Sequence, residues 1–413
     1  MNKLITIFLT TVLIMMSFSV YSQRNCGTTI YLNHQQSKNP LLKQQMKIQE
    51  KAIQEWIDNS KKSNEEIVYI PVIFHVLYNN STTDISDQQI YSQIDILNDD
   101  YSRNNADSIN TPAMFDSLAA DIRIQFCVSH QTPDGDWTNG ITRTSTTKST
   151  FDLSSDEAKF DSKGGVDAWD IEKYLNIWIV PEIIDGGMTN ILGYAQMPGG
   201  SAATDGVVVG YKYIGNIGTV SSPFDKGRTL THEIGHYFSL YHIWGDDFNA
   251  CTGSDFVDDT PNQASNNFGC PTHPHASCGN NGDMFQNFMD YTDDDCMNLF
   301  TIGQKDRMLA ALNTQRSTLI TSGMCQTIYI DKTNDLNFSI SPNPASSTIN
   351  IRLEEKSSSV DVLITDVTGR IIMTATTNNN EIIINTSSFP NGIYFLQMKD
   401  NTKVGIQKFI IQQ

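Results

Sequence analysis

The segment that decides the fold is HEIGHYFSLYH, which spans residues 232–242. His232 and His236 are four positions apart, so on an α-helix their imidazoles project from one face, about one turn apart. This spacing lets two imidazoles bind one Zn²⁺ ion, with Glu233 beside a metal-bound water. His242 can reach the same ion only if the helix ends and the chain turns. Three histidine ligands leave a fourth position open for water, as catalytic zinc sites do.

This arrangement predicts a particular chemistry. Zinc lowers the pKa of its bound water to about 7 and polarises a peptide carbonyl. Glu233 is expected to accept the proton of that water and to pass it to the leaving amine. Histidines buried without a metal are the competing interpretation, and the placement of His242 argues against it. The segment therefore predicts a zinc-dependent endopeptidase.

Ser239 departs from the HExxHxxGxxH pattern, which has glycine at this position. Glycine adopts positive φ freely, whereas serine there costs about 1–2 kcal/mol. A well-packed domain tolerates such a cost, and the substitution removes no ligand. We expect the turn after the histidine helix to form all the same.

Bulk composition and the first residues indicate export. The chain has 413 residues and a formal net charge of −18, without a basic stripe, so nucleic acid is excluded as an expected partner. Residues 1–22 resemble a signal peptide, because Lys3 precedes an uncharged run to Val20. A membrane anchor is the alternative, but serines and threonines dilute the run and no basic cluster follows it. We predict export through the periplasm and a mature form without a membrane span.

Composition also divides the chain into domains. Residues 23–64 are rich in Gln, Lys and Asn and form a leader. Residues 65–328 alternate between strand and helix patterns, which predicts an α/β (α+β) domain with its active-site helix beneath a mixed sheet. After a linker at 329–337, residues 338–413 show short alternating strands separated by turns, without cysteine or histidine. They predict a small all-β sandwich.

Seven cysteines fit an oxidising compartment. Four of them lie in a stretch rich in Gly, Asn, Asp and Pro: Cys251, Cys270, Cys278 and Cys296. Two disulfides are the natural way to order such a stretch, and four cysteines allow three pairings. Cys26, Cys127 and Cys325 stand apart. The odd count leaves at least one cysteine free or with a special role.

Together, these motifs resemble the pappalysin family of metzincins, in particular bacterial enzymes of the ulilysin type. The resemblance covers about Val68 to Cys325 and is firmest at THEIGH (231–236), HIWGD (242–246) and NFMDY (287–291). It implies that Met289 forms a hydrophobic floor under the zinc, where an ordinary core methionine is the alternative. It also implies that Tyr291 swings toward the metal and stabilises the tetrahedral oxyanion.

The resemblance chooses among the cysteine pairings and gives Cys26 a role. It implies the disulfides Cys251–Cys278 and Cys270–Cys296. It also implies that Cys26, in the leader, acts as a cysteine switch by occupying the open zinc position in the zymogen. The alternative for Cys26 is a disulfide to one of the remaining cysteines.

Two further sites follow from the resemblance. Asp255, Asp259 and Thr260 match a calcium-binding segment, and their hard oxygen atoms suit Ca²⁺. A solvated acidic turn is the alternative. Asp295 corresponds to an acidic residue of the S1′ pocket, where a buried carboxylate favours Arg, or Lys, at P1′.

The C-terminal sandwich resembles the sorting domain of the type IX secretion system. The matching motifs are SPNP (341–344), DVTGR (366–370), NGIY (391–394) and KFI (408–410). The resemblance implies interaction with the type IX machinery, removal of the domain, and release or attachment at the cell surface. A carbohydrate- or protein-binding module is the alternative for this domain.

Two rival functions for the whole chain remain. One is a non-catalytic surface protein that binds through a metzincin scaffold, and the other is a zinc hydrolase acting on something other than protein. The intact zinc-binding segment argues against the first, because loss of Glu233 or of one histidine would be its usual sign. No motif for a sugar or lipid supports the second.

Overall fold

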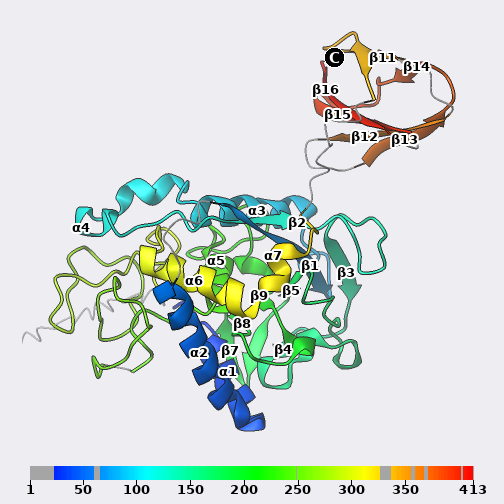
Figure 1. Cartoon of the computed structure of the whole chain (residues 1–413). Helices are drawn as coiled ribbons and strands as arrows, with labels where there is room; N and C mark the ends of the chain where they lie inside the picture. Colours follow the sequence, from blue (N-terminus) through cyan, green and yellow to red (C-terminus); the bar gives the residue numbers. More distant parts are fainter. Residues whose placement is uncertain are drawn as a thin grey trace, which may run out of the picture.

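The computed structural model describes residues 23–59, 66–247, 249–325, 336–354, 359–366, 371–400 and 403–412 (Figure 1). The predicted signal peptide at 1–22, most of the predicted linker, and residues 367–370 of the DVTGR motif lie outside them. None of the helices that it describes is long and apolar enough to span a bilayer.

The leader folds onto the domain that follows it. It forms two helices, α1 (Thr28–Lys38) and α2 (Leu41–Asn59). In Figure 1 the blue helix α2 lies against α6 (Ile302–Gln315). Ile53 packs against two alanines of α6, and both carboxylate oxygens of Glu50 accept hydrogen bonds from Arg307 at 2.6 Å. The leader is therefore held by apolar packing and by a bidentate ion pair.

A mixed sheet forms the centre of the catalytic domain. Its strand order is β2 (Ile124–Val128), β1 (Val68–Tyr78), β5 (Leu175–Val180), β9 (Val207–Gly210) and β8 (Gly193–Ala195). β3 (Ile141–Ser145) pairs with the second half of β1, beyond β2. The β8–β9 pair is antiparallel, whereas the other pairs are parallel. The central strands β5 and β9 are buried along their whole length, as expected of parallel strands covered on both faces.

Helices cover one face of this sheet. α3 (Asp87–Tyr101) begins after its N-cap, Ser86, whose hydroxyl accepts from the Gln89 backbone N–H. α5 (Arg228–Tyr237) carries the histidine motif and packs against β8, β9 and α3. Leu230, Ile234 and Tyr237 of α5 join the main apolar core. The predicted mixed α/β domain, with its active-site helix against the sheet, is confirmed.

Smaller elements surround this core. β4 (Phe151–Asp152), β6 (Ile183–Asp185) and β7 (Met188–Ile191) form a second sheet. Two short helices are α4 (Ala113–Asp116) and α7 (Ser317–Thr321). Single 3₁₀ turns lie at Ala106–Asn110, Leu153–Ser155, Glu157–Lys159, Asp161–Lys163, Ala202–Thr204 and Tyr211–Tyr213.

The C-terminal residues form the predicted sandwich. One antiparallel sheet contains β10 (Phe338–Ser341), β11 (Thr348–Leu353) and β14 (Glu381–Asn385). The other contains β13 (Ile371–Thr377), β12 (Val360–Asp366), β15 (Gly392–Lys399) and β16 (Val404–Ile411). Along β11, alternate residues are buried in the sandwich core. This alternation is the reason that the sequence predicted an all-β domain.

Three disulfides hold the catalytic domain. Cys251 pairs with Cys278 and Cys270 pairs with Cys296, which are the pairs implied by the family resemblance. A third bond joins Cys127 at the end of β2 to Cys325 after α7, a pairing that the sequence left open. Among the cysteines that the structure describes, Cys26 has no disulfide partner.

The end of α5 explains how the third histidine returns to the first two. The Leu240 N–H donates to the Gly235 carbonyl and the Ser239 N–H to the His236 carbonyl, both at 2.9 Å. These two bonds define a Schellman motif, which requires a left-handed residue at the position of Ser239. Ser239 has φ 70° there. The turn forms with serine in place of glycine, as expected.

Ser239→Gly is expected to raise the free energy of unfolding by about 1 kcal/mol, because glycine adopts this φ without strain from a Cβ. Ser239→Ala keeps the Cβ and serves as the matched control. Urea unfolding of the full chain measures both variants. Equal stability of the glycine and alanine variants would show that the turn carries no such strain.

Candidate active site

Three histidines bring their Nε2 atoms to one point. The His236 Nε2 atom lies 3.1 Å from that of His232 and 3.1 Å from that of His242. Around a tetrahedral zinc with bonds of about 2.0–2.1 Å, ligand nitrogens lie about 3.3 Å apart. The three side chains are buried, and His236 already has nearly this spacing from each of the other two. The site can therefore hold a tetrahedral metal ion with little rearrangement.

The opposite ring nitrogens fix the direction of each imidazole. Each Nδ1 has an acceptor: the Phe288 carbonyl at 2.7 Å for His232, the Leu240 carbonyl at 2.8 Å for His236, and Asp246 Oδ1 at 2.8 Å for His242. An N–H at Nδ1 leaves the lone pair on Nε2, facing the shared point. This is the tautomer that a metal ligand needs.

Burial favours the neutral form of these rings. It lowers the pKa of His236 to about 3 and the pKa of His232 well below its ordinary value. Neutral imidazole is the form that binds metal, so two of the three histidines need lose no proton at neutral pH.

Glu233 lies next to the cluster on α5 and is buried. Burial raises the pKa of its carboxyl group to about 7. A Cβ added at Gly193 of β8 would lie 2.9 Å from Glu233 Cγ, so glycine lets the edge strand approach this carboxylate. In the structure, Glu233 Oε2 accepts a hydrogen bond from the leader hydroxyl of Thr28 at 2.8 Å.

Met289 lies directly under the histidine helix. Its side chain is fully buried, and a Cβ added at Gly235 would lie 2.5 Å from its sulfur. Gly235 is therefore required for the close approach of Met289 to the turn that carries His232 and His236. This placement agrees with the hydrophobic floor implied by the sequence.

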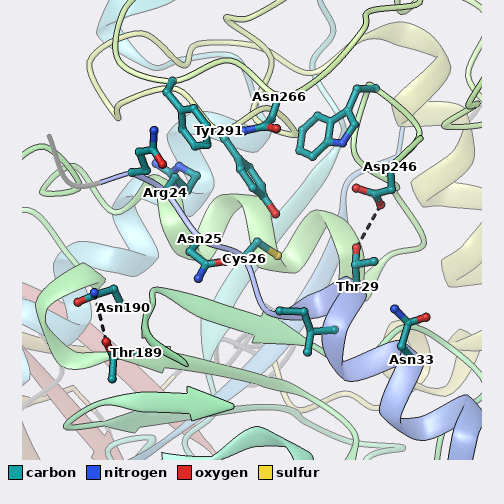
Figure 2. A pocket seen from close by; sticks show the side chains of 14 residues that line it. Arg24, Asn25, Cys26, Thr29, Asn33, Thr189, Asn190, Asp246, Asn266 and Tyr291 are labelled. Atoms are coloured by element: carbon teal, nitrogen blue, oxygen red, sulfur yellow. Dashed lines mark hydrogen bonds between the residues drawn. The ribbon is translucent and has the colours of Figure 1, made fainter. Parts of the chain in front are cut away.

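Tyr291 lies beside the histidine cluster and packs against His242 and Trp244. Its ring centroid lies 4.9 Å from His242 and 4.8 Å from Trp244, and Trp244 stacks on His242 at 4.3 Å. In Figure 2 the Tyr291 ring points toward Cys26 in the cleft. Tyr291 is thus close enough to the histidines to act on a substrate bound there.

The leader occupies the cleft in front of the cluster. Cys26 Sγ and the ligand nitrogens of the three histidines lie within 4.8 Å of one another. The leader backbone pairs with the edge of the sheet, because the Gly27 N–H donates to the Gly193 carbonyl and the Leu192 N–H to the Asn25 carbonyl, at 2.8 and 2.9 Å. The remaining open cleft has a volume of about 660 Å³ and is lined by Thr29, Tyr291 and Trp244, among others (Figure 2).

A leader arginine fills a second pocket beside the cleft. The Arg24 side chain is buried, and its Nη2 donates to Asp294 Oδ1. Its other nitrogens donate to the Thr292 carbonyl at 3.1 Å and to the Thr229 hydroxyl at 3.2 Å. The pocket thus binds a guanidinium through a buried carboxylate and neutral acceptors.

The prediction that Asp295 is a buried pocket carboxylate is wrong. Its side chain is 74% exposed and forms an ion pair with Lys226 at the surface. The Cys296 N–H donates to the Asp293 carbonyl at 2.9 Å, and this turn directs Asp294 inward and Asp295 outward. Asp294 is fully buried, and its Oδ2 accepts from the Lys226 backbone N–H at 2.8 Å.

Two of the three residues expected to bind calcium, Asp255 and Thr260, are hydrogen-bonded to each other. Asp255 accepts from the Val257 N–H at 3.1 Å and from the Thr260 hydroxyl at 2.8 Å. Asp259 instead accepts from Thr301 and Gly303 at the start of α6. Each of these carboxylate oxygens accepts a hydrogen bond from the protein. The calcium site stays a prediction.

Two protein-family models match this chain, one in the catalytic domain and one in the C-terminal sandwich. Residues 159–313 match the peptidase M43 family model, described as pregnancy-associated plasma protein-A. Residues 339–412 match the secretion system C-terminal sorting domain. An extracellular metalloprotease from Arthroderma benhamiae is 30% identical over 62% of this chain and 78% of its own length. One from Arthroderma gypseum is 28% identical over 71% of this chain and 85% of its own length.

Solved structures agree with these relatives. Mature mirolysin from Tannerella forsythia, in complex with a cleaved peptide, is 48% identical with a TM-score of 0.59. The match covers 62% of this chain and 96% of that one. A promirolysin mutant from the same organism is 44% identical with a TM-score of 0.66, over 72% and 97% of the two chains.

The fold and the histidine cluster define a metalloendopeptidase of the metzincin type. The chain belongs to the pappalysin family, peptidase M43, and ends in a type IX sorting domain. Its place of action is therefore the cell surface or the exterior. The family implies a metal ion, normally zinc. These findings confirm the family and the sorting domain expected from the sequence.

Sequence reasoning missed three residues that the structure brings to the site. The sequence assigned the pocket carboxylate to Asp295 instead of Asp294, and it gave no role to Arg24 or Thr28 of the leader. Arg24 could have been found, because a basic residue two positions before a switch cysteine is a natural partner for a predicted acidic pocket.

Proposed function

We propose that this chain is a secreted zinc endopeptidase, kept latent by its leader, that cuts peptide bonds on the amino side of arginine. The observation that carries the proposal is the convergence of His232, His236 and His242 beside Glu233. A non-catalytic binding protein remains the alternative. Cleavage of a peptide library by the leader-free protein separates the two functions.

The residues around the cluster have distinct roles in this proposal. Bound zinc supplies a Lewis acid that activates water and polarises the scissile carbonyl. Glu233 accepts the proton of the attacking water and delivers it to the leaving amine. The Tyr291 hydroxyl donates a hydrogen bond to the oxygen that becomes negative during attack. Met289 supports the histidines from below, and the buried surroundings strengthen each of these interactions.

Arginine preference follows from the pocket that Arg24 fills. A substrate arginine in the same pocket would meet the carboxylate of Asp294 and the neutral acceptors of Thr229 and Thr292. Asp294 therefore takes the S1′ role that the sequence gave to Asp295. Lysine lacks the planar fork of donors and is expected to bind less well.

The domain order completes the proposal. Residues 1–22 direct export and are removed, residues 23–64 maintain latency, and residues 65–328 perform the reaction. After the linker at 329–337, residues 338–413 serve as the address for secretion. Retention of the sandwich on the mature protein would favour a binding module instead.

Glu233→Ala in the leader-free enzyme is expected to lower kcat by on the order of a thousandfold, because proton transfer is lost. Zinc content, measured by atomic absorption, should not change, because no ligand is removed. Glu172→Ala at an exposed position is the matched control. Cleavage of a peptide library, with and without 1,10-phenanthroline, measures activity. A zinc-loaded, leader-free protein that cuts no peptide would favour the binding-scaffold alternative.

Asp294→Asn is expected to lower the ratio of kcat/KM for arginine over leucine at P1′ by at least about tenfold, because the pocket loses its charge. Asp295→Asn is the matched control and should leave the ratio within about twofold. Paired peptides that differ only at P1′ measure the ratio. If only Asp295→Asn lowers this ratio, Asp295 and not Asp294 is the carboxylate of the S1′ pocket.

Cys26 is proposed to hold the metal in the latent form, because its sulfur lies beside the three histidine nitrogens. In cobalt-substituted full chain, a thiolate-to-cobalt charge-transfer band is expected, and Cys26→Ala should abolish it and speed release of the leader. Asn25→Ala, whose side chain contacts Met188 away from the histidines, is the control. A band that persists without Cys26 would contradict the switch.

A further inference from the structure

A second leader side chain is buried in the catalytic domain, on the face of the sheet opposite α5. Tyr31 of α1 is 1% exposed and belongs to an apolar cluster with Trp178, Tyr194 and Leu153. Its ring centroid lies 4.8 Å from that of Tyr194 on the edge strand β8. Every other buried residue of this cluster comes from the catalytic domain. Removal of the leader would therefore open a pocket with aromatic walls.

Charged groups meet the hydroxyl end of Tyr31. Its O–H donates to Asp156 Oδ1, and it accepts from the ammonium group of Lys159 at 3.3 Å. Lys159 is fully buried, and its ammonium lies over the faces of Tyr31 and Tyr194, 4.4 and 4.8 Å from the centroids. It also donates to the Thr204 carbonyl at 2.7 Å. Both an acceptor and a donor are therefore placed for a phenol.

These groups lose a partner when the leader leaves. A buried ammonium is costly unless it is paired, and Lys159 then keeps the Thr204 carbonyl and the ring of Tyr194. Asp156 is held at φ 55°, a backbone strain that the surrounding structure maintains. A tyrosine side chain restores both hydrogen bonds and the ring contacts, whereas phenylalanine restores only the ring contacts. The pocket therefore distinguishes the two by chemistry as well as by shape.

The position of the pocket relates it to the cut. Arg24 precedes Cys26 and fills the pocket assigned to P1′, whereas Tyr31 follows Cys26. Along the leader, the two side chains therefore lie on opposite sides of the cysteine that faces the histidines. We propose that in the leader-free enzyme this pocket is a non-primed subsite that binds a tyrosine side chain N-terminal to the scissile bond. The inference rests on the proposed peptidase function and adds a second determinant to its specificity.

The test uses the processed enzyme and peptides with arginine fixed at P1′. Tyrosine, phenylalanine or alanine is placed in turn at each position from P2 to P6. At one position, kcat/KM for tyrosine should exceed that for phenylalanine by about tenfold, the size expected when a charged partner loses its hydrogen bond. Asp156→Asn should remove this preference. Asp134→Asn, at an exposed position, is the matched control and should keep the preference.

Two outcomes would overturn the inference. In the first, peptides are cut but no position from P2 to P6 distinguishes tyrosine from phenylalanine. The pocket then binds only the leader, and the proposed peptidase function is still supported. In the second, the Asp156→Asn variant has the thermal stability of the wild type and keeps the preference for tyrosine. The Asp156 carboxylate then does not bind the substrate phenol. Failure to cut any peptide would instead remove the proposed function itself, so the two failures are distinguishable.

Discussion

The structure depends on pointing three buried imidazoles at one position. Two of them share a face of α5, but the third arrives only because the helix stops at Tyr237 and the chain reverses through Ser239. Each ring then needs an acceptor behind it, which Phe288, Leu240 and Asp246 provide. Leu240 and Phe288 belong to the main apolar core, and two disulfides order the polar stretch between them.

The leader occupies the cleft in front of these histidines. Two ion pairs anchor it, the buried pair of Arg24 with Asp294 and the partly buried pair of Glu50 with Arg307. Arg307 also donates to the Ser239 carbonyl at 2.8 Å, so one anchor touches the turn that places the third histidine. Buried charges gain little net stability when paired but cost much when left alone. Departure of the leader therefore leaves charged pockets that a substrate can satisfy.

Local patterns predicted well what depends on local geometry. The spacing of His232 and His236 requires a helix, and alternating residues of β11 require a half-buried strand. Side-chain direction in a tight turn changes with every residue, so sequence could not separate Asp294 from Asp295. Contacts of the leader, such as Arg24 with Asp294, join positions 270 residues apart and leave no periodic trace. The same is true of the Cys127–Cys325 bond, which spans 198 residues.

That bond also has a topological consequence. It closes residues 127–325 into a covalent ring, and the ring contains the histidine helix and the two other disulfides. A single backbone cut inside the ring converts it to a linear chain but releases no fragment. Such a protein can be nicked by its own copies, or by neighbouring proteases, and still retain every ligand of its metal site on one covalent molecule.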